Sequence, residues 1–507
     1  MIRRLSLSLL LIAFVVVPAA AQQTPSAPTT GALVVWISEG IAPDTRPAGF
    51  PSEVAAVLPN GTVSTLLEFD TATIGVQRCS SRPTSTDGRR FAFFASQPSA
   101  GIDRGTLYQM TDLGAPQVVA VTHKLTCALE NFAYSPNGAQ MAYIDFANYD
   151  ENLENITGTL RVIDTDSLQP QAEFERVAAF TLENDELLYL QFFPNASDQV
   201  TEVAVSSWDG GTGREVSSIT AVAGCRFTGG AITAVGEDAI AVVMGERCRA
   251  RTGQVRWQVY LVDRASRSST LLASGAQAGG YFPATQTYMI AATRDGSAIV
   301  FSASDGLARD SASVYTIDLL AADPSAEPII NRAATVRRYV PLRYALGDIA
   351  TALRSPNGRY WALGVNAPEG AELAVLDVSA AGPPIRIPIN RAGDAVRAMG
   401  FTLDSTALLY TTGGAAGRDT SLYRLDLQSG VETLVARGQY AATMAVRADG
   451  AVALIQYKQT TETSPRPYVD VVVVDPDGTQ RDRLGGVVLD AQGFLEGFRV
   501  AVPLAWR

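Results

Sequence analysis

The chain has 507 residues, a formal net charge of −11 and a hydrophobic fraction of 47%. This acidic balance argues against non-specific binding to nucleic acid, which needs a basic surface, and it does not favour adhesion to anionic lipid. A chain of this length ordinarily predicts two or three domains, unless internal repeats organise it as one array.

The chain opens with the features of a secretory signal. Arg3 and Arg4 precede an apolar segment, Leu5–Val17, and Ala19–Ala21 fits the small-residue rule for cleavage. The apolar segment is too short to favour a spanning helix, and no later stretch is long enough, so no transmembrane segment is expected after cleavage. We therefore expect a signal peptide at 1–21, a Pro/Ser/Thr linker at 22–31, one domain at 32–507, and a secreted, periplasmic or extracellular location.

One short phrase, an apolar strand that ends in Asp, returns about every fifty residues, which is a period of repeat architectures. Its copies are Leu107–Asp112, Leu160–Asp164, Val259–Asp263, Val314–Asp318, Leu373–Asp377, Leu422–Asp426 and Val471–Asp475. Such a period indicates supersecondary units that bury their faces against their neighbours.

Each unit also contains two apolar segments joined by a turn. The turn dipeptides are Asp87-Gly88, Asn137-Gly138, Asn184-Asp185, Gly236-Glu237, Asp295-Gly296, Asn357-Gly358, Asp404-Ser405 and Asp449-Gly450. Such residues are favoured in hairpin turns because they tolerate positive φ. The flanking segments have strand periodicity, and a weaker outer strand such as Val431–Val435 follows the Asp. Four antiparallel strands per unit describe the blade of a propeller.

Three segments carry a family resemblance. Tyr134–Ile144 (YSPNGAQMAYI), Arg354–Leu363 and Thr293–Phe301 resemble the SPDG motif of WD40-like (PD40, TolB-like) β-propeller repeats. The resemblance implies an all-β propeller fold. Counting the units along the chain predicts a single large ring of eight or nine four-stranded antiparallel blades rather than two small propellers. It implies no single function, because such blades occur in assembly proteins, peptidase gating domains and enzymes alike.

The two ends of the domain supply a way to close the ring. Ala32–Ser38 reads as the second strand of a first unit that lacks its innermost strand, and Phe494–Leu504 is a spare strand. Pairing the two would remove an open sheet edge. The unit near Asn184 is the least regular, because it lacks the Asp phrase.

The residues offer little catalytic chemistry. The recurrent Asp is best explained as a turn residue whose carboxylate accepts hydrogen bonds from the next turn. His123 is the single histidine, so the chain has no His-pair metal site, and we expect any activity to survive His123→Ala. We find no GxSxG elbow, P-loop or GxGxxG before a helix.

Acidic residues gather in one loop, where Asp145, Asp150, Glu151 and Glu154 accompany Tyr149. Such carboxylates could bind Ca²⁺ or serve a glycosidase. Their spacing matches no calcium loop, so we favour a solvated acidic loop and expect no cofactor or metal.

The connections after the second strand of each blade lie on one face of a propeller, and four of them read as long. They are Glu39–Phe50, Phe146–Thr157, Asp305–Ala312 and Lys458–Pro467. Long loops on one face indicate a binding face, although variable decoration explains them equally well. Arg247, Arg249 and Arg251 lie in the corresponding loop of another blade and could add a basic spot. With the acidic loop, they are the candidate binding residues.

Four cysteines in an exported chain predict two disulfides. A two-residue turn at Gly236-Glu237 would set Cys225 directly opposite Cys248. The count places them at a hydrogen-bonded pair, where the side chains diverge, so a disulfide there calls for a bulge or a slight register change. Cys79 and Cys127 precede their turns by similar distances, so we predict a second bond between the innermost strands of two adjacent blades.

Our main functional hypothesis is an exported, non-catalytic propeller that binds a protein, peptide or envelope glycan through its long-loop face. The rival hypothesis is a carboxylate-based hydrolase or lyase at the mouth of the central channel. A convergent pair of buried acids would favour that rival. A third hypothesis is a gating ring without its peptidase domain.

Overall fold

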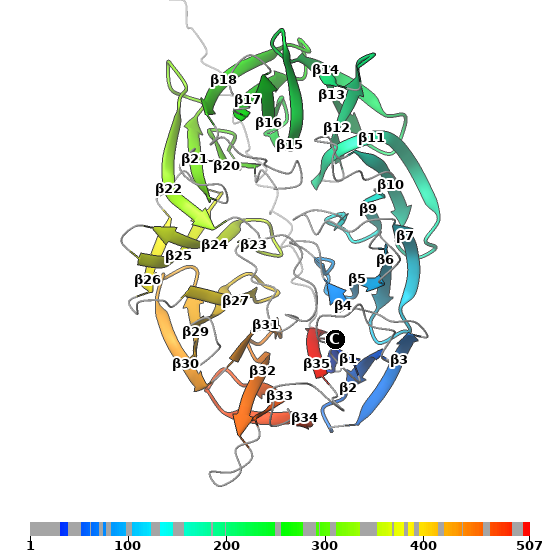
Figure 1. Cartoon of the computed structure of the whole chain (residues 1–507), viewed down its shortest axis with the longest axis vertical. Coiled ribbons are helices and arrows are strands. Elements are labelled where there is room, and N and C mark those ends of the chain that lie inside the picture. The colour runs from blue at the N-terminus through cyan, green and yellow to red at the C-terminus, as the bar shows by residue number, and fades with distance from the viewer. Residues whose placement is uncertain are drawn as a thin grey trace, which may run out of the picture.

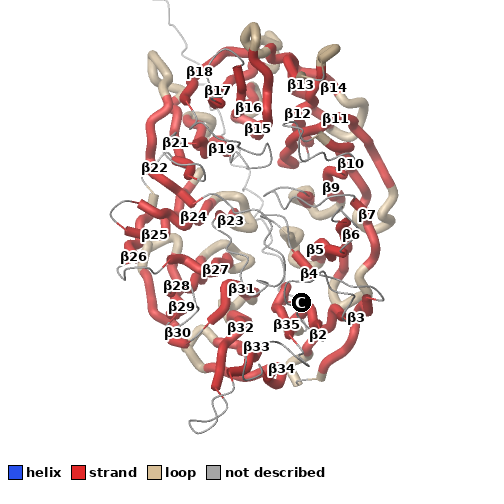
Figure 2. The backbone as a smooth tube through the Cα atoms, viewed as in Figure 1, coloured by secondary structure: helices blue, strands red, loops and turns tan. Residues whose placement is uncertain are grey.

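The computed structural model consists of strands and connecting loops throughout its described residues (Figure 2). These residues are 31–38, 52–60, 62–69, 75–77, 83–97, 104–122, 132–145, 157–183, 186–197, 199–248, 255–276, 290–293, 295–304, 311–334, 352–367, 370–379, 384–389, 395–413, 420–438, 440–459, 467–488 and 500–506. No helix within them has the length and apolar character needed to cross a membrane.

The strands form antiparallel four-stranded blades that follow one another around an oval ring (Figure 1). We number the blades along the chain and give their strands from the innermost outward. Blade 1 contains β35 (Val500–Trp506), β1 (Leu33–Ser38), β2 (Ser52–Val57) and β3 (Val63–Phe69). Blade 2 contains β4 (Gly75–Gln77), β5 (Arg90–Gln97), β6 (Arg104–Thr111) and β7 (Gln117–Thr122). Blade 3 contains β8 (Phe132–Tyr134), β9 (Gln140–Asp145), β10 (Gly158–Asp164) and the first part of β11 (Pro170–Glu183).

The next three blades follow the same order. Blade 4 contains the second part of β11, then β12 (Glu186–Pro194), β13 (Val200–Trp208) and β14 (Arg214–Thr220). Blade 5 contains β15 (Cys225–Val235), β16 (Ala239–Cys248), β17 (Val255–Asp263) and β18 (Ser269–Ala276). Blade 6 contains β19 (Ile290–Ala292), β20 (Ala298–Ser304), β21 (Ser311–Asp318) and β22 (Ala326–Ala334).

The last three blades bring the described strands to nine blades, within the predicted eight or nine. Blade 7 contains β23 (Ala352–Arg354), β24 (Tyr360–Ala367), β25 (Gly370–Asp377) and β26 (Ile385–Ile389). Blade 8 contains β27 (Ala395–Phe401), β28 (Ala407–Gly413), β29 (Thr420–Asp426) and β30 (Glu432–Gly438). Blade 9 contains β31 (Tyr440–Val446), β32 (Val452–Gln459), β33 (Pro467–Val474) and β34 (Gln480–Val488).

The C-terminal strand closes the ring, as predicted. β35 pairs with β1 from Leu33↔Trp506 to Ser38↔Val500. The indole Nε1 of Trp506 donates to the carbonyl of Ala445 in blade 9 at 3.0 Å. The strand lies further along the chain than the predicted Phe494–Leu504, because the aromatic residue that seals against blade 9 is Trp506.

The core lies between neighbouring blades rather than in one centre, and β1 illustrates why. Val34 and Trp36 pack toward Phe91 and Phe93 of blade 2. The alternate residues, Leu33, Val35 and Ile37, pack toward blade 9. Successive strand side chains point to opposite faces, so a strand covered on both faces reads as a continuous apolar run.

Blades 3 and 4 share one strand, which explains the irregular unit near Asn184. β11 bends at Arg176, whose φ is 60°. Val177 pairs with Gly158 of blade 3 on one side and Gln191 of blade 4 on the other. The outer strand of blade 3 therefore continues directly into the innermost strand of blade 4.

Candidate functional site at the ends of the ring

The ring has two ends that differ in character. At the turn end, the innermost strand of each blade turns into the second strand, as at residues 85–90. At the loop end, the second strand connects to the third, as at residues 39–51. The two ends would therefore present different residues to a ligand.

The turns of the turn end are built from their own side chains. In blade 7 the hydroxyl of Ser355 donates to Asn357 Oδ1 at 2.7 Å and accepts the amide of Tyr360 at 2.9 Å. Gly358 then takes a φ of 72°, in the left-handed region that glycine enters without steric cost. The Asn and Asp residues of these turns are therefore structural, as the sequence predicted.

The recurrent Asp also has a structural role. Five copies accept backbone amides of the following turn: Asp164, Asp263, Asp318, Asp377 and Asp426. The other two differ from the prediction, because Asp112 pairs with Arg89 at 3.0 Å and Asp475 pairs with Arg481. Hydrogen bonds from the backbone amides of Ser167, Ser266 and Ser429 lower the pKa of Asp164, Asp263 and Asp426 respectively. Carboxylates held this way stay ionised and are poorly suited to act as general acids.

The inner turns of non-adjacent blades also touch across the ring. Arg354 of blade 7 pairs with Glu183 of blade 4, Nη2 to Oε1 at 3.2 Å, although blades 5 and 6 lie between them along the ring. A Cβ placed on Gly88 of blade 2 would lie 2.9 Å from Leu403 Cδ2 of blade 8, so the Leu403 side chain rests on the Gly88 backbone. β23 of blade 7 reaches toward the middle of the ring (Figure 1). These contacts join inner turns of opposite blades across the middle of the ring at its turn end.

At the loop end, two of the four connections predicted to be long are shorter than the sequence suggested. Residues 39–51 and 146–157 separate the second and third strands of blades 1 and 3. The corresponding connections of blades 6 and 9, residues 305–310 and 460–466, are shorter than expected because the flanking strands extend further. The long connections themselves lie outside the described residues.

Two of the predicted binding residues are described, and they lie on different blades. Asp145 ends β9 of blade 3, is 8% exposed, and pairs with Arg161 of β10 at 3.3 Å. Arg161 also bonds Glu173 at 3.2 Å, which forms a chain of charges across the blade. Arg247 lies near the end of β16 in blade 5. Tyr149, Asp150, Glu151, Glu154, Arg249, Arg251 and His123 lie outside the described residues.

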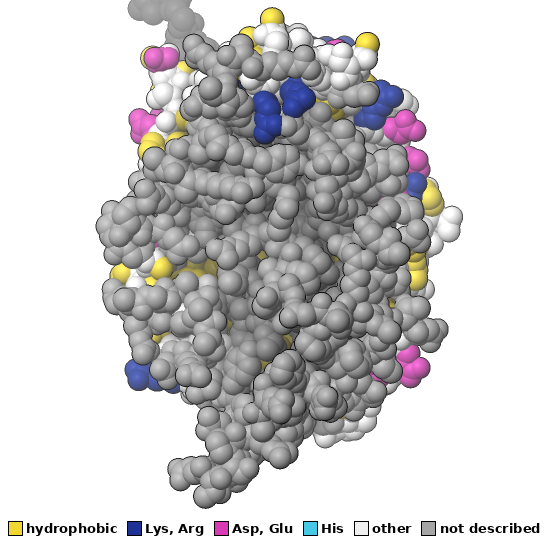
Figure 3. All heavy atoms as spheres, in the orientation of Figure 1, with side chains coloured by type: hydrophobic (Ala, Val, Ile, Leu, Met, Phe, Trp, Pro, Cys, Tyr) yellow, Lys and Arg dark blue, Asp and Glu magenta, His cyan; other side chains and the backbone are white. Residues whose placement is uncertain are grey.

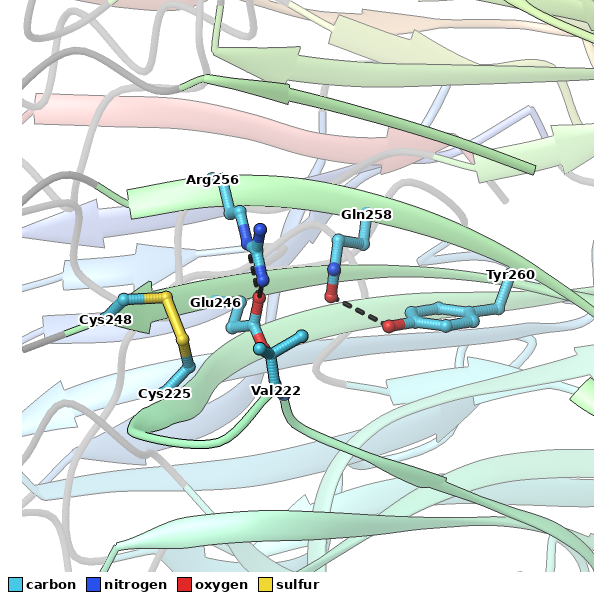
Figure 4. Close-up of a disulfide and its surroundings, with 7 residues drawn as sticks. All are labelled: Val222, Cys225, Glu246, Cys248, Arg256, Gln258 and Tyr260. Carbon is cyan, nitrogen blue, oxygen red and sulfur yellow. Dashed lines mark hydrogen bonds and ion pairs between the residues drawn. A yellow bond between two sulfur atoms is a disulfide. The ribbon is translucent and has the colours of Figure 1, made fainter. Parts of the chain in front are cut away.

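The disulfide Cys225–Cys248 lies at the loop end of blade 5, as predicted (Figure 4). The two residues are directly opposite in β15 and β16. The turn differs from the prediction, because it has three residues, with Val235 opposite Ala239. A bulge between Phe227 and Gly229 restores the register, and the Cα–Cα distance of 4.0 Å is that of a close, non-hydrogen-bonded pair. Cys79 and Cys127 lie outside the described residues, so their bond stays a prediction.

Sequence reasoning missed the buried carboxylate beside this disulfide. Glu246 is fully buried and accepts the amide of Val222 at 2.8 Å. Its other oxygen binds Arg256 of β17, which is directly opposite it (Figure 4). Nearby, Tyr260 donates to Gln258 at 2.8 Å, and burial followed by the charge of Glu246 raises the pKa of Tyr260 to about 12. The detectable signal was the Glu that directly follows the apolar run 239–245 and faces Arg256 of the next strand.

The described residues offer little for a metal or for acid catalysis. Cys225, Glu246 and Cys248 are the one described group with three ligand atoms within 4.8 Å, but both sulfurs are joined in the disulfide. Among the described carboxylates, Asp145 and Glu246 are the buried ones, they belong to blades 3 and 5, and each is paired with an arginine. They do not form the convergent acid pair that the hydrolase hypothesis needs.

Comparison with known proteins gives structural neighbours only. No model of a protein family matches the chain, and no curated protein matches its sequence. A eukaryotic initiation factor is similar at 11% identity with a TM-score of 0.47, covering 94% of this chain and 98% of that chain. The β-propeller domain of the trilobed protease from Pyrococcus furiosus is similar at 12% identity with a TM-score of 0.36, covering 68% and 94%. Dipeptidyl peptidase 4 from Porphyromonas gingivalis is similar at 11% identity with a TM-score of 0.44, covering 79% and 58%. Propeller proteins are thus among the structural neighbours.

Proposed function

We propose that the protein is an exported, non-catalytic β-propeller built of WD40-like (PD40, TolB-like) repeats, which binds a protein, peptide or envelope glycan through its loop end. The observation that carries this proposal is the difference between the two ends of the ring. At the turn end, inner turns touch across the axis through Arg354–Glu183 and Leu403–Gly88. At the loop end, the connections differ in length from blade to blade. Variable connections on a rigid repeat scaffold are where ligands are usually bound.

The alternatives fit these contacts less well. A gating ring passes its substrate along the axis, and the contacts at the turn end would have to break at each passage. A carboxylate-based hydrolase or lyase needs two acids close together, one of them with a raised pKa. The recurrent Asp residues have the opposite property, because the pKa values of Asp164, Asp263 and Asp426 are lowered.

The test compares variants of the two ends in the mature chain. Cosedimentation with purified peptidoglycan sacculi and binding to a peptide array supply the two probes. In the loop variants, residues 39–51 or 146–157 are replaced by Gly/Ser segments of equal length. The control, Arg89→Ala with Asp112→Ala, removes an exposed ion pair at the turn end.

We expect the loop variants to lose binding to whichever probe the parent binds, while the control retains it. Binding that survives both loop replacements but disappears in the control would place the binding site at the turn end and would contradict the proposal. Release of reducing ends from a polysaccharide by the purified parent would favour the hydrolase or lyase instead.

A further inference from the structure

Three potential metal ligands lie close together at the loop end of blade 5. The sulfurs of Cys225 and Cys248 and a carboxylate oxygen of Glu246 all lie within 4.8 Å of one another (Figure 4). Basic side chains mark the surface of the molecule where Figure 1 draws β15 to β17 (Figure 3). A zinc ion lies about 2.3 Å from a thiolate sulfur and about 2.1 Å from a carboxylate oxygen, so the ligands of one ion are within about 4 Å of each other. The spacing of the three groups is therefore close to that of a zinc site.

The hairpin of β15 and β16 places these three groups together. Cys225 is directly opposite Cys248, in a pairing that continues along the hairpin to Val235 opposite Ala239. Glu246 is two residues before Cys248 on β16, and alternate residues of a strand share a face. Backbone pairing along the hairpin therefore keeps the three side chains together when the disulfide is reduced.

The carboxylate of Glu246 keeps an acceptor position that a metal ion can use. Glu246 is fully buried, and its Oε2 binds Arg256. Its Oε1 accepts the amide of Val222 at 2.8 Å. Each oxygen of a carboxylate accepts at about two positions, so Oε1 retains one of them.

The charges of the group also suit a divalent ion. Two thiolates and the Glu246 carboxylate carry three negative charges, and Zn²⁺ with the Arg256 guanidinium carries three positive ones. A buried group whose charges cancel costs much less than an uncompensated buried charge. Thiolate ligands select zinc over magnesium and calcium, which prefer sites made of oxygen atoms alone.

We propose that reduction of the Cys225–Cys248 bond turns this end of blade 5 into a zinc site, with Cys225, Cys248 and Glu246 as ligands. A dithiol reductant gives two electrons and two protons: its own sulfurs form a disulfide, and the Cys225–Cys248 bond becomes two thiols. Zn²⁺ then binds both sulfurs and the carboxylate, and the two thiol protons pass to water. Cys248 is half-buried, so this end of the hairpin is open to solvent. Three protein ligands leave the fourth position of a tetrahedral ion to water. The site is independent of the ligand that the loop end binds.

The test is a zinc titration of the mature protein in competition with a chromophoric chelator. The protein is reduced with dithiothreitol and freed of reductant and metal under argon. We expect the reduced parent to bind zinc and the oxidised parent not to compete for it. Glu246→Gln should weaken zinc binding by about tenfold or more, with folding checked by circular dichroism. The matched control is Glu186→Gln, because Glu186 also pairs with an arginine but lies outside the three-residue group, and its affinity should equal that of the parent.

A second measurement identifies the ligating cysteines without any substitution. The reduced parent is alkylated with iodoacetamide in the presence and absence of zinc, and the modified cysteines are located by peptide mapping. We expect zinc to slow the alkylation of Cys225 and Cys248 by about tenfold or more and to leave Cys79 and Cys127 unchanged.

Four results would each overturn the proposal. The first is that the folded, reduced parent binds no zinc, and the second is that the oxidised parent binds zinc as tightly as the reduced one. The third is zinc protection of Cys79 and Cys127 in place of Cys225 and Cys248. The fourth is a folded Glu246→Gln variant that binds zinc as tightly as the Glu186→Gln control, because Glu246 would then not be a ligand.

Discussion

Removing the C-terminal strand should open the ring, and the structure allows the cost to be estimated. A chain that ends at residue 499 loses all of β35, including Leu504 and Trp506, which are 4% and 6% exposed. It also exposes the ladder edge of β1, from Leu33 to Ser38. Free strand edges and their apolar faces invite association with other chains.

The expected cost is a large share of the stability of the fold. Truncating a buried Trp costs about 3–5 kcal/mol, and losing a buried Leu adds about 2–3 kcal/mol. Together they come to about 5–8 kcal/mol, which is half or more of a typical unfolding free energy of about 5–15 kcal/mol. With about 2 cal/mol/K of unfolding entropy per residue, a chain of this length has an unfolding entropy of about 1 kcal/mol/K. The melting temperature should therefore fall by about 7 °C, and by about 4 °C for Trp506→Ala alone.

Thermal and urea unfolding followed by circular dichroism measures both variants in the mature protein. Leu320→Ala is the matched control, because it removes a large apolar side chain that is 80% exposed. It should melt within about 1 °C of the parent, since surface changes of this kind cost little. A truncated protein that melts as the Leu320 variant does would refute closure by β35.

The remaining predictions concern the disulfide, the contact across the axis and the turn carboxylates. Cys225→Ser with Cys248→Ser should lower the urea unfolding free energy by about 3 kcal/mol in the chain-entropy model, and non-reducing peptide mapping should find Cys225 linked to Cys248 in the parent. A double-mutant cycle of Glu183→Ala and Arg354→Ala should give a coupling energy of about 0.5–1 kcal/mol, whereas strictly additive effects would mean that the pair does not couple the two blades. The hydroxyl and then the amide of Ser297 lower the pKa of Asp295 to about 2, below its unfolded value, so its contribution to stability is present above about pH 4 and is lost as the pH falls toward 2. The urea midpoint of Asp295→Asn should accordingly fall less than that of the parent between pH 4 and pH 2.

Local chemistry explains why most of the architecture could be predicted from sequence. A turn such as Ser355–Gly358 is specified by residues within it, namely the Ser355 hydroxyl, the Asn357 side-chain amide and Gly358. Such a turn can therefore be predicted from the local sequence alone. Strands buried on both faces read as apolar runs between such turns. Closure of the ring by the C-terminal strand could be predicted because the first unit lacks its innermost strand and the C-terminal end of the domain has one strand more than its unit needs.

Features that depend on packing between distant residues could not be predicted. The shared strand of blades 3 and 4 bends at Arg176, a non-glycine residue that gives no sign of its φ of 60°. The Arg354–Glu183 pair depends on how far β23 reaches across the ring, which no local pattern encodes. The pairing of Glu246 with Arg256 depends on a second register, that of β16 with β17, which is independent of the β15–β16 register that places the cysteines opposite each other.

The strand shared by blades 3 and 4 limits where the chain could be circularly permuted. A circularly permuted chain needs new termini at a point where no sheet is cut. At Val177 both neighbours, Gly158 and Gln191, are paired to the same residue, so a break there would damage two blades at once. The stretch between β18 and β19, residues 277–289, joins strands of separate sheets. A circular permutation with its new termini in residues 277–289 should therefore be tolerated. Blades 3 and 4, which share β11, should be separable only at the cost of both blades.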